Sequence, residues 1–91
     1  MALDKELRGS IGTNLAYFTF QQYQLVKDGA CSGLTGLLGP QLMQAESLKQ
    51  IAYHRLELIK AVGTTEGFRD ILHTIDLLEA FIAEHSEEAS A

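Results

Sequence analysis

The chain has 91 residues, of which 46% are hydrophobic and 21% are charged, and its formal net charge at pH 7 is −5. This length fits one small domain, and the composition excludes a wholly disordered chain. No apolar run approaches the roughly 20 residues that a membrane-spanning helix needs, so we expect no membrane association. The single cysteine, Cys31, has no partner for an intrachain disulfide, and the first residues lack the apolar core of a secretory signal. Both features favour a cytoplasmic protein.

Charge is divided unevenly along the chain. Residues 1–63 hold six basic and five acidic side chains, whereas the residues from Thr64 onward hold one basic and seven acidic side chains. Phosphate backbones are bound through clustered lysine and arginine. Nucleic acid is therefore not an expected partner.

The first predicted helix covers about residues 11–27. Apolar residues recur there at steps of three and four, as on an amphipathic helix. Gly9 and Gly12 disfavour helix near its start, and Asp28-Gly29 is typical of a helix end. Residues 1–9 are expected to fray, with a turn from Asp4 to Arg8 as the alternative.

The second and third predicted helices cover about residues 40–62 and 64–85 and form an antiparallel αα-hairpin. Pro40 suits a first helical position, Gly63 can close the second helix in the left-handed conformation, and Thr64 suits the N-cap of the third. The hairpin is expected to pack on the first helix as one all-α, three-helix domain over 1–91, with 86–91 as a disordered acidic tail.

The first helix carries more apolar surface than such a monomer can bury. Four aromatic residues lie within seven positions, from Tyr17 to Tyr23, and they point around most of the helix. Large exposed apolar patches usually mark interfaces, so we expect self-association, as a homodimer that completes a helical bundle. Tyr17, Phe20 and Tyr23 are the expected contacts. The alternative is that the tyrosines only keep their hydroxyls in water.

The glycine-rich segment KDGACSGLTGLLGP, residues 27–40, lacks the lysine and spacing of a phosphate-binding loop. Leu34, Leu37 and Leu38 have the spacing of a short helical turn. They either cover the end of the bundle or assist Tyr17, Phe20 and Tyr23 in binding a partner.

Two histidine and carboxylate groupings have the spacing of metal ligands on a helix. They are His54-x-x-Glu57 and Asp70-x-x-His73-x-x-Asp76. Metal-binding bundles need such ligands to project inward, but these fall on the polar faces opposite the apolar stripes. We therefore interpret them as solvated faces and expect no cofactor. No serine lies in the glycine-flanked turn of a hydrolase nucleophile, and we expect no enzyme.

These observations favour a non-enzymatic, cytoplasmic protein–protein interaction module, such as an adaptor, regulator or chaperone-like protein, that acts as a homo-oligomer. Two alternatives stay open. One is a metal- or small-ligand-binding bundle that uses the histidine and carboxylate groupings. The other is a structural subunit of a larger assembly, which would use the same apolar surfaces.

Overall fold

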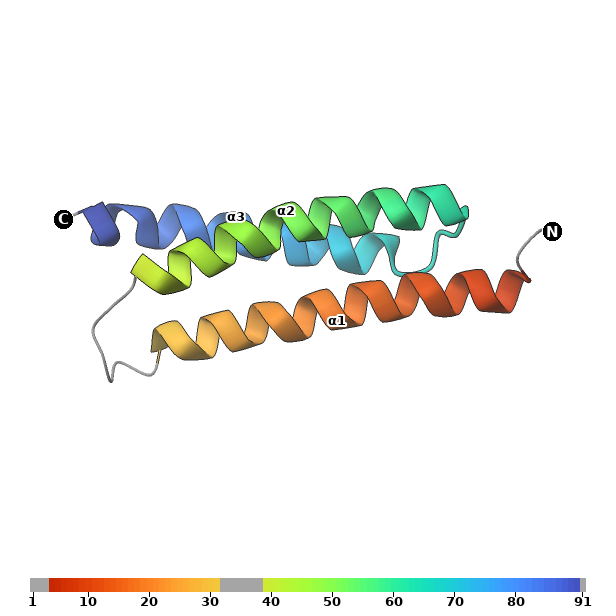
Figure 1. The fold of residues 1–91 in the computed structure, drawn as a ribbon, viewed down its shortest axis with the longest axis horizontal. Helices are drawn as coiled ribbons and strands as arrows, with labels where there is room; N and C mark the ends of the chain where they lie inside the picture. The colour runs from red at the N-terminus through yellow and green to blue at the C-terminus, as the bar shows by residue number, and fades with distance from the viewer. Residues whose placement is uncertain (1–3, 32–38, 91) are drawn as a thin grey trace.

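Three helices make up the fold: α1 over Lys5–Cys31, α2 over Gly39–Val62 and α3 over Phe68–Ser90. The computed structural model describes residues 4–31 and 39–90, and those residues contain no strand, so the predicted all-α class is confirmed. Helices α1 and α3 run in one direction and α2 runs in the other, and each helix packs against both others (Figure 1). The result is a rod with extents of 53 × 19 × 17 Å.

Helix α1 begins well before the predicted start at residue 11. It passes through Gly9 and Gly12 without a break, because these glycines face the α2–α3 connection at close range. A Cβ atom on Gly12 would overlap the backbone carbonyl oxygen of Glu66. The close packing offsets the entropic cost that glycine imposes on a helix. Asp4 precedes the helix, and its carbonyl oxygen accepts the N–H of Arg8 at 2.9 Å.

Helix α1 also ends later than predicted, because Asp28-Gly29 does not stop it. The side chain of Gln41 in α2 lies against Gly29, and a Cβ there would come within 2.8 Å of Gln41 Nε2. The glycine therefore serves the contact between the two helices rather than a turn. The segment with Leu34, Leu37 and Leu38 lies outside the described residues.

Helix α2 ends as the sequence predicts, at a glycine in the left-handed conformation. Gly63 has φ of +82° and donates its N–H to the carbonyl of Lys60 at 3.1 Å, while the N–H of Thr64 points to the carbonyl of Ile59 at 3.5 Å. This pair is the Schellman pattern of helix ends. The second helix therefore has the predicted boundaries to within one residue.

Helix α3 begins at Phe68 rather than at residue 64. The Thr64 hydroxyl does accept a backbone N–H, from Glu66 at 3.1 Å, but it caps a turn and not the helix. Gly67 then takes a positive φ of +81°, and its carbonyl accepts the N–H of Ile71. The helix also continues to Ser90 instead of ending at 85, through glutamate and alanine residues that favour helix.

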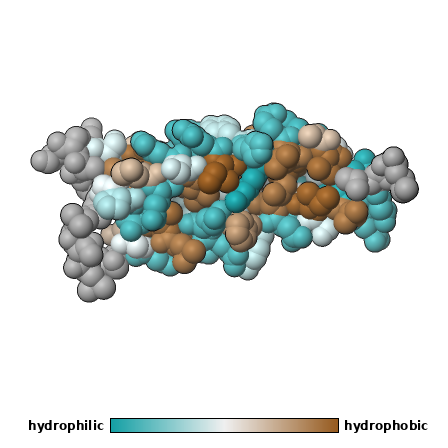
Figure 2. Space-filling view, in the orientation of Figure 1, coloured by the Kyte–Doolittle hydropathy of each residue, from teal (hydrophilic) through white to brown (hydrophobic). Residues whose placement is uncertain are grey.

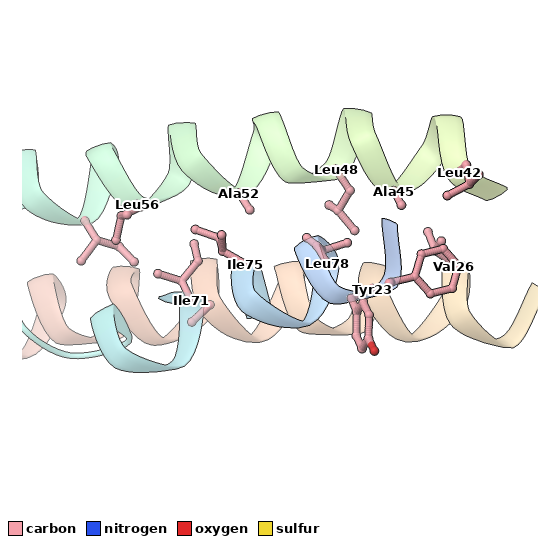
Figure 3. Packing of buried hydrophobic residues seen from close by; sticks show 13 residues of the cluster. Tyr23, Val26, Leu42, Ala45, Leu48, Ala52, Leu56, Ile71, Ile75 and Leu78 are labelled. Atoms are coloured by element: carbon pink, nitrogen blue, oxygen red, sulfur yellow. The ribbon is translucent and has the colours of Figure 1, made fainter. Parts of the chain in front are cut away.

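The core runs the length of the bundle between the three helices (Figure 3). Alanines at positions 16, 45 and 52 let the helices approach, and Ile59, Ile71 and Leu78 are fully buried. Two buried threonines satisfy their hydroxyls inside their own helices, Thr19 on the carbonyl of Leu15 and Thr74 on that of Asp70. None of the helices, over the residues described, is both long and apolar enough to cross a membrane.

Candidate functional site

Several large apolar side chains stay exposed on the bundle. They are Leu7, Tyr17, Phe18, Leu25, Met43, Ile51, Tyr53, Leu58 and Leu72. The most exposed are Leu25 at 71% and Met43 at 70%, and they lie on facing turns of α1 and α2. In the view of Figure 2 hydrophobic colour gathers in patches over α1 and α2, with hydrophilic surface between them.

A groove of about 560 Å³ lies between α1 and α2, and we call it the α1–α2 groove. Its lining residues are Gln22, Leu25, Val26, Pro40, Met43, Gln44, Ser47, Leu48 and Ile51. Among the described residues, none that lines it carries a formal charge. Apolar side chains, methionine and a lack of charge distinguish the centres of protein interfaces from the remaining surface.

Arg55 of α2 bridges to α1 beside this groove. Its Nη1 donates to the hydroxyl oxygen of Thr19 at 2.9 Å and to the amide oxygen of Gln22 at 2.8 Å. The guanidinium also lies over the ring of Phe18, 5.1 Å from its centroid. Partial burial lowers the pKa of Arg55 from its usual value. The bridge ties Gln22, a groove residue, to α2.

No carboxylate neutralises Arg55 in the described part of the chain, where the one ion pair joins Lys60 to Glu57 at 3.2 Å. A half-buried cation is tolerated when its donors are satisfied and its charge rests on an aromatic face. Thr19 and Gln22 accept from Nη1, and the ring of Phe18 lies beneath the charge. These contacts also fix the spacing of α1 and α2 at one end of the groove.

A second depression lies between α1 and α3, with a volume of about 320 Å³, and we call it the α1–α3 hollow. Its lining residues are Thr13, Ala16, Tyr17, Phe20, Asp70, His73 and Thr74. Unlike the groove it combines aromatic rings with one carboxylate and one imidazole. It therefore brings together two predicted partner contacts, Tyr17 and Phe20, and two metal-ligand candidates, Asp70 and His73.

The residues predicted to bind a partner fall in different places. Tyr17 is 61% exposed and Phe20 is partly buried, and both line the α1–α3 hollow. Tyr23 is only 8% exposed and belongs to the core, where its ring lies 6.1 Å from that of Phe20. Tyr23 therefore adds little to the outer surface of this chain.

The predicted metal-ligand candidates do not converge. Asp70 and His73 share the α1–α3 hollow, but His54 and Asp76 are exposed elsewhere, and Glu57 pairs with Lys60. Within the described residues no group of three or more histidine, cysteine or acidic side chains could hold a metal ion. The inward-facing arrangement of a metal-binding bundle is not formed by these residues.

Sequence reasoning missed Met43, Ile51 and Arg55 as members of a site. The sequence did contain a signal for Arg55. Ile51, Leu58 and Val62 form an apolar stripe on α2, and position 55 lies on the same stripe, one turn after Ile51 and one turn before Leu58. A charged residue within an apolar stripe indicates a polar contact between helices.

A scan against protein-family models gives no match to this chain, and searches against curated proteins and solved structures give none either. The fold defines the class, a small all-α protein of three packed helices. Fold class alone does not determine function. What bears on function is therefore the chemistry of the groove and the hollow.

Proposed function

We propose that this protein is a non-enzymatic interaction module of the cytoplasm, and that it self-associates through the α1–α2 groove. The observation that carries the proposal is the groove itself. It is mainly apolar and carries no formal charge among the described residues, and its two most exposed large apolar side chains, Leu25 and Met43, come from different helices. Complete burial of one such side chain contributes about 1.5–3 kcal/mol, so a few of them can hold a dimer together.

The charge distribution favours a second copy as the occupant of the groove. The chain carries a net charge of −5, and the excess of acid lies in the residues from Thr64 onward. Two copies therefore repel each other most where their α3 helices meet. The uncharged groove is a surface on which two copies can meet without like-charge repulsion. In a two-fold dimer the same patch is used on both chains, which suits a patch that lacks charge.

The polar side chains of the groove supply specificity to the proposed contact. Gln22, Gln44 and Ser47 lie among the apolar residues and offer hydrogen bonds to the facing chain. Arg55 keeps Gln22 in place from outside the groove. The apolar centre then supplies affinity, and the amides fix how the two chains are aligned.

The test measures the solution mass of three proteins by light scattering after size exclusion. We expect a mass of two chains, twice 10.0 kDa, for the natural protein. Met43→Glu should reduce it to one chain, because it buries a charge in the interface. Leu72→Glu is the matched control, since Leu72 is also exposed, at 38%, but lies on α3 outside the groove.

Two results would overturn the proposal. One is a mass of a single chain for the natural protein at micromolar concentration. The other is a dimer that Met43→Glu leaves intact. A circular dichroism spectrum of each variant shows that its helices are retained, so a lower mass reports on the interface and not on the fold.

A further inference from the structure

The α1–α3 hollow differs from the α1–α2 groove in shape and in chemistry. Two small buried residues, Ala16 from α1 and Thr74 from α3, form its base, and the exposed Thr13 lies at its edge. Ala16 and Thr74 are 2% and 1% exposed, so the depression reaches the edge of the core. The Thr74 hydroxyl donates to the carbonyl of Asp70 at 3.1 Å and is thus engaged within its own helix.

The walls of the hollow carry two kinds of chemistry. Tyr17 and Phe20 supply aromatic surface from α1, and Asp70 and His73 supply a carboxylate and an imidazole from successive turns of α3. Of the residues that the structure describes, no lysine or arginine lines the hollow. Asp70 is exposed, and its carboxylate forms no ion pair with another described residue.

A small apolar depression with a few polar groups is typical of ligand sites. Among the described residues that line this hollow, the only group with a fixed formal charge is a carboxylate, and two aromatic rings line the same hollow. Cations are attracted both to carboxylates and to the faces of aromatic rings. An anion would meet Asp70 and the acidic surroundings of α3, and a neutral ring would leave the carboxylate unused.

We propose that the α1–α3 hollow binds an organic ammonium ion, that is, an amine carried on a small ring or short alkyl body. The ammonium group pairs with Asp70 and lies beside the ring of Tyr17. The apolar body packs on Phe20 and Ala16 at the base. His73 offers a further hydrogen-bond acceptor in its neutral form. The proposal is independent of self-association, because no residue of the hollow lines the groove.

The test is a titration with benzylamine, followed by ¹H–¹⁵N NMR spectra at constant pH and salt. We expect saturable shifts that are confined to residues 13–20 of α1 and 70–74 of α3. Benzyl alcohol has the same ring without the charge, and benzoate has the opposite charge. Since an exposed ion pair is worth up to about 1 kcal/mol, benzyl alcohol should bind about fivefold more weakly, and benzoate should cause no saturable shifts.

Two variants separate the specific site from the general acidity of α3. Asp70→Asn should weaken benzylamine binding about fivefold, to the level of benzyl alcohol. Asp76→Asn removes the same charge from the same helix outside the hollow and should leave the affinity unchanged. Equal weakening by both variants, equal affinity for benzylamine and benzyl alcohol, or shifts spread along α3 would each overturn the proposal. The Met43→Glu variant should bind benzylamine as the natural protein does.

Discussion

Arg55 of α2 donates a hydrogen bond to the hydroxyl oxygen of Thr19 in α1, at 2.9 Å, and Thr19 is completely buried. The same hydroxyl donates its own proton to the carbonyl oxygen of Leu15 at 2.6 Å. Thr19 thus presents its oxygen to α2 in a fixed direction. A charge between two helices is held by one hydroxyl, one amide and one aromatic face, without a carboxylate among the described residues.

Replacing Thr19 by valine should destabilise the protein by about 1–3 kcal/mol. Valine keeps the shape of threonine but removes the acceptor, so Arg55 loses one of its two hydrogen-bond acceptors on α1. Urea denaturation measures the loss. Thr74→Val is the control, because Thr74 is equally buried and its hydroxyl bonds only within its own helix. Equal losses in the two variants would show that the bridge to Arg55 adds nothing.

Replacing Gly12 by alanine should destabilise the bundle by about 1–3 kcal/mol, since the new Cβ overlaps the carbonyl oxygen of Glu66. On an isolated helix the same change stabilises by about 1 kcal/mol, so the sign of the effect reports on the packing. Gly39→Ala is the matched control. No atom beyond its chain neighbours lies within 4 Å of a Cβ at Gly39, so that variant should lose much less stability than Gly12→Ala. Thermal unfolding of both variants tests the pair.

Replacing Tyr23 by serine should unfold or strongly destabilise the protein, by about 3–5 kcal/mol, because Tyr23 is part of the core. Replacing Tyr17 by serine should change the stability by no more than about 0.5 kcal/mol, since Tyr17 is 61% exposed. Chemical denaturation distinguishes the two. A Tyr23→Ser variant of normal stability would contradict the packing of α1 described above.

The hydroxyl of Tyr53 donates a hydrogen bond to a carboxylate oxygen of Glu79 at 2.5 Å. That bond, followed by desolvation and the negative charges of Glu79 and Asp76, raises the pKa of Tyr53 above the ordinary 10.0. The folded state therefore holds this proton more tightly than the unfolded state. The resulting stability is present below the ordinary tyrosine pKa and is lost as the pH rises through the raised value.

Absorbance titration of tyrosinate in the natural protein and in Glu79→Gln checks this pKa. The ionisation of Tyr53, identified by its absence in Tyr53→Phe, should move to lower pH in Glu79→Gln. It should stay in place in Glu84→Gln, which removes another exposed acid from α3. Identical titrations of the natural protein and Glu79→Gln would mean that the bond between α2 and α3 is absent in solution.

The sequence predicted the number of helices and their order, because the apolar period and the Gly63 cap are local signals. It placed the ends of α1 wrongly, because the tolerance for Gly12 depends on Glu66, which lies in the α2–α3 connection and is distant in sequence. Local propensity does not contain such a contact. The predicted end of α3 at residue 85 was wrong for a simpler reason. Residues without apolar contacts can extend a helix when their helix propensity is high.

The candidate sites were predictable only in part. Helix α1 has two apolar faces, and its sequence alone does not decide which of them packs on α2 and α3. The structure buries the face with Tyr23 and leaves Phe18 and Leu25 outside. The meeting of Tyr17 with Asp70 and His73 in one hollow depends on the parallel alignment of α1 and α3, which no local pattern records.

The most direct test of the proposed self-association is an isotope-filtered NMR experiment on mixed chains. One set of chains carries ¹³CH₃ in the methionine methyl groups and deuterium at every other carbon-bound position, and the other set carries neither ¹³C nor deuterium. The chain has two methionines, so the Met43 methyl is readily assigned. We expect nuclear Overhauser effects from the Met43 methyl of one chain to apolar groove residues of the other. If the Met43 methyl shows no effect to any carbon-bound proton of the undeuterated chains, the groove is not the surface through which two copies meet.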